Sequence, residues 1–416
     1  MSKRFNSVLV LMCLISTSFA QQFVLQEDPM VQEYYVVKQQ KNVWFSSNKN
    51  LKCANEWLTL IELSDVYPTI LNKSQIDKIR TALNHKNMID SSYKMTIDRQ
   101  LTGLVLHYIK DKQQGTVHFD YDEISNPRDS VYINQLLTID SKRQISSFNS
   151  EIECTDPAYV FLGKYLKDSI SIYDTLKYKA IELAMNYRLF FTLNHQSEYI
   201  VVNILSAEAE YYKNNTIVVG MRAVVGRKLN PTPVLASYIT SIITFPYWNV
   251  PHSIAVKEIL PKVQKNENYL EQNNFNVVDA TGTDLDDSDL KWRNFTEENF
   301  PYFFRQSTGS ENALGVLKFN LINPYSIFLH ATSNQAVFTR TNRFLSHGCI
   351  RLEKPFELAN ALLDGKLDVE TLKTGKKDTE SNKIMLLHKI PTFIIYMPIQ
   401  IVGNKVVFLP DVYGLL

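Results

Sequence analysis

Cys349 lies in the segment Ser346-His347-Gly348-Cys349-Ile350-Arg351, and a second histidine, His330, follows the apolar segment Phe328-Leu329. A cysteine attacks a carbonyl carbon as its thiolate, so it needs a group that takes its proton. An imidazole titrates near neutral pH and can return that proton to a leaving amine. The two segments therefore indicate a cysteine nucleophile with a histidine base. The alternative is a buried structural cysteine beside two unrelated histidines.

Within this pair His330 is the candidate general base, because a side chain at the end of a strand is held rigidly. Its second ring nitrogen needs an acceptor, for which the backbone carbonyl of Ala331 is the candidate. Gly348 lets the backbone approach a substrate closely. The amide N–H groups of Gly348 and Cys349 are candidates for binding an oxyanion.

The flanking residues have two interpretations each. Arg351 either orients a substrate carboxylate or holds the loop through a carbonyl, and His347 either contacts substrate or packs beside Cys349. A metal site is a further alternative. However, His252 and His388 lie in no ligand-like spacing and the chain has no Cys-x-x-Cys pair, so we expect neither a metal nor a cofactor.

The composition is that of a folded protein with ordinary cores. The chain has 416 residues, 45% hydrophobic and 21% charged, which indicates two or three domains. The net charge of +1 and the lack of a dense basic stripe with aromatics argue against a nucleic-acid partner.

The first twenty residues have the pattern of an export signal. Lys3 and Arg4 precede an apolar run at 8–15, and Ser18-Phe19-Ala20 forms a small-x-small cleavage site. We expect cleavage after Ala20 and a location in the periplasm or cell envelope of a bacterium. Lipidation at Cys13 and retention as an uncleaved anchor are the alternatives.

Cleavage would leave three cysteines, which is an odd number for an exported protein. The simplest account is one disulfide between Cys53 and Cys154, with Cys349 as the remaining thiol. Geometry decides whether the two thiols are close enough to bond.

The hydrophobic periodicity predicts an α+β protein in two parts. Residues 21–195 read as mainly helical, with Leu101, Leu104 and Tyr108 at helical spacing before Gly115. This half carries no group of catalytic residues, so we predict a scaffold domain.

Residues 196–416 read as a mostly β domain. Strands are predicted at 199–204, 208–212, 217–225, 314–319 and 326–329, followed by a helix at 354–363 and a hairpin from 391–402 to 405–409. The segment from 228 to about 305 is less regular, with prolines and an acidic stretch at 284–289, and is predicted to be an insertion.

The segment around Cys349, with His330 upstream, resembles the signature of the L,D-transpeptidase catalytic domain, also called the YkuD domain. Further segments are similar to its YcbB-like branch: Met221–Arg227, Thr232–Val234, Trp248–Pro251, Ile259–Val263, Tyr269-Leu270 and Leu314–Asn320. The resemblance covers residues 196 to 412, and several separated motifs occur in the family's order.

This resemblance implies a catalytic role for Cys349 as nucleophile and for His330 as base, with His347 and Gly348 completing the catalytic segment. It further implies substrate contacts by Ser346, Arg351, Ala331, Trp248 and Asn249. The insertion at about 249–304 matches a capping subdomain over the substrate groove.

The reaction implied by the resemblance is acyl transfer between peptidoglycan tetrapeptide stems, giving a 3-3 cross-link, with carbapenems as inhibitors. The chain departs from the family at Ala331, where many relatives have Gly or Asp, and it shows no clear peptidoglycan-binding helical module. Two other functions stay open: a cysteine L,D-carboxypeptidase or hydrolase acting on stem peptides or protein–peptidoglycan links, and a non-catalytic envelope scaffold.

Overall fold

A computed structural model describes residues 28–64, 69–124, 127–142, 144–169, 174–194, 197–214, 216–376 and 379–416. The export signal expected at 1–20 lies outside these ranges. Within them, no helix combines the length and the apolar character that a membrane crossing requires.

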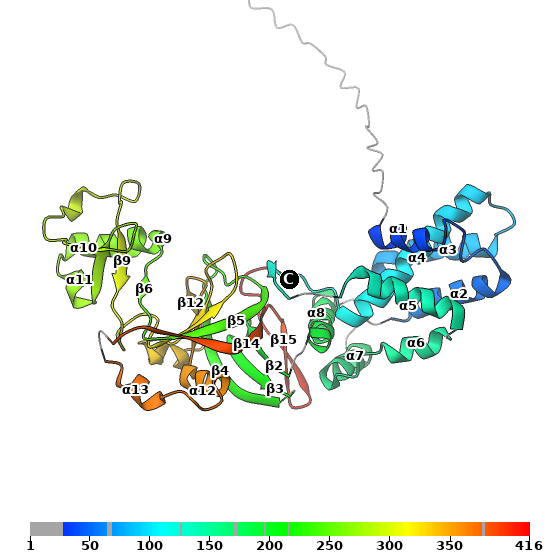
Figure 1. The fold of residues 1–416 in the computed structure, drawn as a ribbon. Coiled ribbons are helices and arrows are strands. Elements are labelled where there is room, and N and C mark those ends of the chain that lie inside the picture. The colour runs from blue at the N-terminus through cyan, green and yellow to red at the C-terminus, as the bar shows by residue number, and fades with distance from the viewer. Residues whose placement is uncertain are drawn as a thin grey trace, which may run out of the picture.

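The first part of the described chain is helical, as predicted, and forms the blue and cyan end of the molecule in Figure 1. Its helices are α1 (Pro29–Val37), α2 (Asn48–Glu62), α3 (Thr69–Asn84), α4 (Ser91–Gln114), α5 (Asp129–Lys142), α6 (Ile145–Glu151), α7 (Pro157–Ser169) and α8 (Thr175–Asn194). One buried cluster containing Trp57, Leu101 and Tyr108 packs α1 to α6 together. Helix α4 ends at Gly115, whose φ of 71° favours glycine, as the sequence predicts.

The disulfide expected between Cys53 and Cys154 is absent, and that expectation was wrong. Cys53 lies in α2 and packs against the large helical cluster. Cys154 lies between α6 and α7 and packs against Leu189 and Tyr159. The two cysteines belong to different hydrophobic clusters, and an odd number of cysteines carries no information about such packing.

The second part of the chain is a β domain whose main sheet closes on itself. Strands pair in the order β5-β10-β11-β13-β4-β3-β2-β14, and β14 also pairs with β5, which completes the ring. The strands of this ring are β2 (Glu198–Asn203), β3 (Glu208–Lys213), β4 (Thr216–Gly226), β5 (Leu235–Thr244), β10 (Leu317–Leu321), β11 (Leu329–His330), β13 (Ile350–Leu352) and β14 (Asn382–Ile395). Two short strands join it, β1 (Tyr121–Asp122) beside β5 and β12 (Phe344–Ser346) beside β4. Helices α12 (Pro355–Leu362) and α13 (Val369–Thr374) and the 3-10 helix η3 (Gln335–Thr339) complete the domain.

Strand β5 lies in the segment that the sequence analysis took for irregular, so that interpretation was wrong. The strand is buried on both faces, and therefore shows no alternation of polar and apolar residues. The buried serine hydroxyls of β5 form hydrogen bonds with residues in and directly after β10. Ser237 donates to the Ile322 carbonyl, and Ser241 accepts from the Asn320 side-chain amide at 2.9 Å.

The C-terminal hairpin is shorter than predicted. It joins β15 (Ile399–Val402) to β16 (Lys405–Phe408), while Pro391 lies inside β14 and pairs with Tyr238 of β5. The sequence analysis merged two strands because β14 is irregular between Met385 and Ile390, which interrupts its pattern.

The insertion forms a small structure of its own at the end of the molecule opposite the helical part (Figure 1). Strands β6 (Trp248–Asn249), β9 (Phe303–Gln306), β7 (Phe275–Val278) and β8 (Asp284–Leu285) make its sheet in that order. Its helical turns are α9 (His252–Ile254), the π-helix η1 (Ala255–Ile259), α10 (Leu260–Lys265), α11 (Tyr269–Gln272) and the 3-10 helix η2 (Trp292–Asn294). A separate buried cluster that includes Trp292 and Phe304 forms its core.

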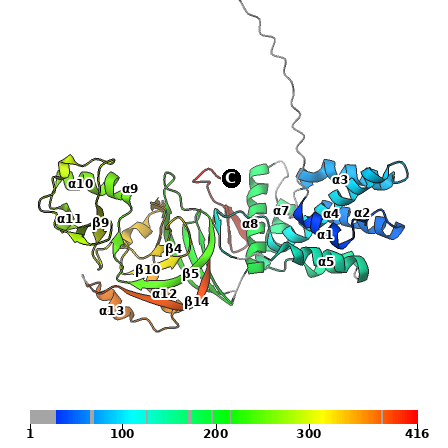
Figure 2. The ribbon, with the colours of Figure 1, turned by 45° about the horizontal axis from the view of Figure 1, so that its top comes forward.

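Helix α8 joins the helical part to the β domain, as Figure 2 shows. Phe190 and Phe191 of this helix pack on Tyr199 and Phe393 in strands β2 and β14. The helical part therefore lies against the β2–β14 region of the ring, whereas the cysteine segment lies between β12 and β13.

Candidate active site

Three neighbouring strands bring polar side chains into one row across the main sheet. Lys318 of β10 is the register partner of His330 in β11, and His330 is the partner of Arg351 in β13. Register partners point to the same face of a sheet. Cys349 precedes Arg351 by two positions, and the ladder continues to its level because the Ile350 N–H donates to the Phe328 carbonyl at 3.1 Å. Cys349 therefore shares the face of this row.

The residues between these polar positions are fully buried in the domain core. They are Leu317, Phe319, Leu329, Ile350 and Leu352. Because side chains alternate along a strand, burying these five residues turns Lys318, His330 and Arg351 to the opposite face. The core thus fixes which residues can meet at the site.

Cys349 is half-buried, and its thiol donates to the Ser326 carbonyl at 3.7 Å. Burial raises the pKa of the Cys349 thiol above its ordinary value, although the backbone amide of Phe328 and the charges of Lys318 and Arg351 act in the opposite direction. The resting nucleophile is therefore a protonated thiol at neutral pH.

His330 is buried, and its Nδ1–H donates to the Ala331 carbonyl at 2.6 Å, which is the acceptor that the sequence indicated. This bond makes Nε2 the basic nitrogen. Gly315 makes the arrangement possible, because a Cβ at that position would lie 2.7 Å from the Ala331 Cβ. Burial, followed by the positive charge of Arg351, lowers the pKa of His330 to about 3.

Side-chain hydroxyls hold the backbone on both sides of Gly348. Ser346 donates to the Cys349 carbonyl at 2.6 Å and accepts the Gly348 N–H at 3.1 Å. Thr232 donates to the Gly348 carbonyl at 2.7 Å. Gly348 has a φ of +118°, which favours glycine, and a Cβ there would lie 3.0 Å from Ile327.

These bonds correct the expected oxyanion site. The Gly348 N–H is already engaged by Ser346, so it does not face a substrate. The Cys349 N–H has no acceptor among the described residues and is the remaining backbone donor beside the sulfur. The sequence alone does not distinguish the two amides as oxyanion donors, because it does not show that the Ser346 hydroxyl accepts the Gly348 N–H.

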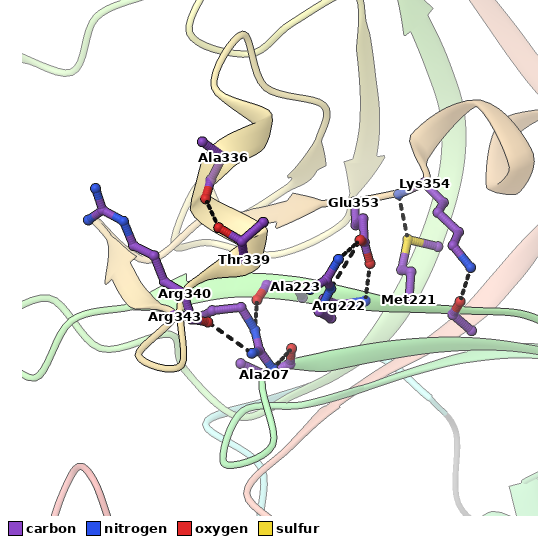
Figure 3. Close-up of polar contacts among 11 residues, drawn as sticks. Ala207, Met221, Arg222, Ala223, Ala336, Thr339, Arg340, Arg343, Glu353 and Lys354 are labelled. Carbon is purple, nitrogen blue, oxygen red and sulfur yellow. Dashed lines mark hydrogen bonds and ion pairs between the residues drawn. The ribbon is translucent and has the colours of Figure 1, made fainter.

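Polar contacts on the neighbouring strand β4 anchor the strand that follows Cys349 (Figure 3). The Arg222 guanidinium and backbone N–H donate to Glu353, directly after β13. Lys354 donates to the Gly220 carbonyl at 3.1 Å, and Arg343 donates to the Ala223 carbonyl at 3.2 Å. These contacts hold the segments on both sides of the cysteine loop against β4.

His347 connects the cysteine loop to the insertion. Its Nε2 lies 2.6 Å from Glu258 Oε1 in the π-helix η1 and 2.9 Å from Arg227 Nη2. Arg227 and Glu258 themselves approach to 3.7 Å. From the sequence, His347 was expected to contact substrate, to pack beside Cys349 or to belong to the catalytic segment, and its partner Glu258 was not identified.

The two remaining predicted substrate residues lie at the base of the insertion. Trp248 and Asn249 form β6 and pair with Gln306 and Arg305 of β9. Trp248 is half-buried and packs near Phe275, with ring centroids 6.1 Å apart. Asn249 is exposed. The structure thus places this pair where the insertion leaves the main domain.

The L,D-transpeptidase catalytic domain, YkuD, matches residues 197–372 of the chain, a range that includes Lys318, His330 and the whole cysteine loop. The matched range, residues 197–372, is thus similar to the catalytic domain of the L,D-transpeptidases. The architecture is α+β, as predicted, with a helical part followed by a mostly β domain that contains the matched range.

The chain is 34% identical over 236 residues to a Haemophilus influenzae protein described as "Putative L,D-transpeptidase". The alignment covers 56% of this chain and 47% of the relative, so the chain spans about half the length of the curated relative that it matches.

Two solved L,D-transpeptidase structures are also similar to the chain. One is the catalytic domain from E. faecium acylated by ertapenem, with 12% identity, a TM-score of 0.23, and coverage of 46% of this chain and 98% of that one. The other, from Mycobacterium smegmatis, has 10% identity, a TM-score of 0.24, and coverage of 48% and 58%.

The pH dependence of Cys349 reactivity tests whether the thiol and the His330 imidazole are both neutral at rest. The raised pKa of Cys349 means that its thiolate fraction keeps growing up to and beyond pH 9. Since the pKa of His330 is lowered to about 3, the imidazole stays neutral above pH 5 and adds no step near pH 6.5. We expect alkylation by iodoacetamide, followed at Cys349 by peptide mass mapping, to rise about tenfold per pH unit from pH 6 to 9. A plateau at neutral pH would instead indicate a thiolate–imidazolium pair and contradict this description.

The substitution Glu258→Gln tests the contact between the insertion and the cysteine loop. Loss of the carboxylate weakens a partly exposed charged contact to His347, for which we expect roughly threefold to tenfold faster local opening. Hydrogen exchange of the amides in 252–265 and 344–350, followed by mass spectrometry, measures this opening. Glu267→Gln, at an exposed position of the same insertion, is the matched control. Equal exchange in both variants would show that the contact does not hold the insertion.

Proposed function

We propose that this protein is a peptidoglycan L,D-transpeptidase of the YcbB-like branch, which forms 3-3 cross-links between stem peptides through a thioester on Cys349. The carrying observation is the row across β10, β11 and β13, which pairs a buried His330, oriented by the Ala331 carbonyl, with Arg351, two residues after Cys349, inside the range that matches the L,D-transpeptidase catalytic domain. The export pattern of residues 1–20 supports a location in the periplasm, where such stems are exposed.

In the acylation step His330 Nε2 takes the proton of the Cys349 thiol, and the sulfur attacks the carbonyl carbon of the L,D-peptide bond. The resulting oxyanion is bound by the Cys349 N–H. The carbon–nitrogen bond then breaks, and His330 gives its proton to the departing amine, which leaves as D-alanine. Cys349 now holds the stem as a thioester.

In the transfer step the side-chain amine of a diamino acid on an acceptor stem attacks the thioester carbonyl. His330 takes a proton from this amine, the carbon–sulfur bond breaks, and the proton returns to the sulfur of Cys349. Water in place of the amine would give a shortened stem, so a hydrolase would use the same first step.

Incubation of the purified protein with tetrapeptide muropeptides tests the proposed reaction. We expect cross-linked dimers that have lost one D-alanine per link, resolved by liquid chromatography and mass spectrometry. Cys349→Ala should abolish these products, whereas Cys53→Ala, a half-buried cysteine of the helical part, should not. Shortened monomers alone would establish the hydrolase instead. An unaltered substrate with the parent protein would refute both reactions.

Substitution of the two histidines separates the proposed base from the residue that contacts the insertion. We expect His330→Ala to slow acylation of Cys349 by a carbapenem about 10²- to 10⁴-fold, the usual contribution of a general base. His347→Ala should have a smaller effect, because that ring faces Glu258. The mass increase of the intact protein with time measures acylation. Equal losses in the two variants would show that the base is wrongly assigned.

A further inference from the structure

Two cations beside Cys349 have no acidic partner among the described residues. Lys318 and Arg351 flank His330 in the row across the sheet, and both are half-buried. Within the described ranges no carboxylate forms an ion pair or hydrogen bond with either side chain. The Arg351 Nε is buried and lacks a hydrogen-bond acceptor in the part of the chain that the structure describes.

Such an arrangement is costly in a folded protein. Burial lowers the pKa of both Lys318 and Arg351, because removal from water disfavours their charged forms. A partly buried cation is normally paired with an anion, and an unpaired donor loses the hydrogen bonds that water gave it. Lys318 recovers a part of this loss by lying over the Phe328 ring, 4.1 Å from its centroid.

The protein's own anions do not fill this role. Glu353, which lies two positions after Arg351 and directly after β13, is bound by Arg222. The Cys349 sulfur interacts electrostatically with both cations, but burial keeps its thiol protonated at rest. The anion that neutralises these two positive charges would therefore be a bound ligand.

We infer that Lys318 and Arg351 form a carboxylate-binding pair, which recognises the acyl donor as an anion beside the nucleophile. This inference rests on the proposed function for the identity of the donor, a stem peptide that carries carboxylates. The class of ligand is a peptide carboxylate, from either the terminal D-residue or the side chain of the diamino acid. The sequence analysis gave Arg351 this role as one of two alternatives, and it assigned no role to Lys318.

Charge balance gives this pair a second effect on the reaction. The positive charges of Arg351 and Lys318 disfavour protonation of His330. A bound carboxylate offsets these charges, and it therefore raises the proton affinity of the base at the moment when the donor is in place. Cys349 therefore loses its proton to His330 more readily in the protein with bound donor than in the free protein.

The experiment compares two small reagents that alkylate Cys349 by the same chemistry, anionic iodoacetate and neutral iodoacetamide. The rate ratio of iodoacetate to iodoacetamide, normalised to that of glutathione, should exceed one for the parent protein. Lys318→Met keeps the apolar stem over Phe328 and should lower the ratio about tenfold, the effect of losing one charge-assisted hydrogen bond. Lys318→Arg should retain the ratio, and Lys405→Met, at an exposed site in β16, is the matched control.

The outcomes are distinct. If Lys318→Met slows both reagents equally, the cations serve only to stabilise the thiolate, and the inference is wrong. An unchanged ratio also overturns it. Neither result depends on peptidoglycan, so failure of the muropeptide reaction with an intact ratio would remove the proposed function and leave the anion site.

Donor peptides then distinguish the two sources of the carboxylate. A tetrapeptide with a C-terminal amide and one with an amidated diamino acid are compared with the free acid. We expect one of the two to show a KM about tenfold higher with the parent protein, and no further loss when Lys318→Met is introduced. If both amides react like the acid, the pair does not bind the donor's carboxylates.

Discussion

The strand register of β10, β11 and β13 is the constraint on which the site depends. Leu317, Leu329 and Ile350 are fully buried, and they fix the opposite face for the intervening residues. A slip by one residue would turn Lys318 or His330 into the core and expose a leucine, so the burial energy of several large side chains opposes it. Burial of the core side chains therefore stabilises the domain and also aligns its reactive groups. No further interaction is needed to place His330 next to the strand that follows the cysteine loop.

Electrostatics at the site favour a neutral pair at rest. Burial raises the pKa of Cys349 and lowers that of His330, so proton transfer between them is uphill before a substrate binds. A unit charge about 5 Å away changes such a balance by about 3 kcal/mol at an effective dielectric constant near 20, equivalent to roughly two pKa units. The positive charges of Lys318 and Arg351 act on both groups: they disfavour protonation of His330 and favour the Cys349 thiolate. Arrival of an anionic donor would offset these two positive charges and so favour protonation of His330.

Residues with a recognisable catalytic chemistry could be predicted from the sequence. Residues that reach the site only through tertiary packing could not. The Cys349 and His330 segments stand out because a thiol, an imidazole and glycine occur at the ends of apolar strands, and the carbonyl of Ala331 is adjacent in sequence to the base that it orients. Glu258 approaches His347 only after the insertion folds back, which no local pattern encodes. Strand β5 was missed for a related reason, since burial on both faces removes the alternation by which a strand is recognised.

The contact of Glu258 with His347 gives the insertion a structural part in the site. The insertion has its own sheet and its own core, which are separate from those of the ring of strands. It meets the cysteine loop through a charged side chain from a π-helix, a rare geometry that often occurs at functional positions. Because His347 is adjacent to Gly348, displacement of Glu258 acts on the loop whose backbone Ser346 and Thr232 hold in place. Movement of the insertion over a bound stem would therefore shift the backbone next to the Cys349 N–H, which is the proposed oxyanion donor. Enclosure of the substrate would in this way be coupled to the alignment of the reacting groups.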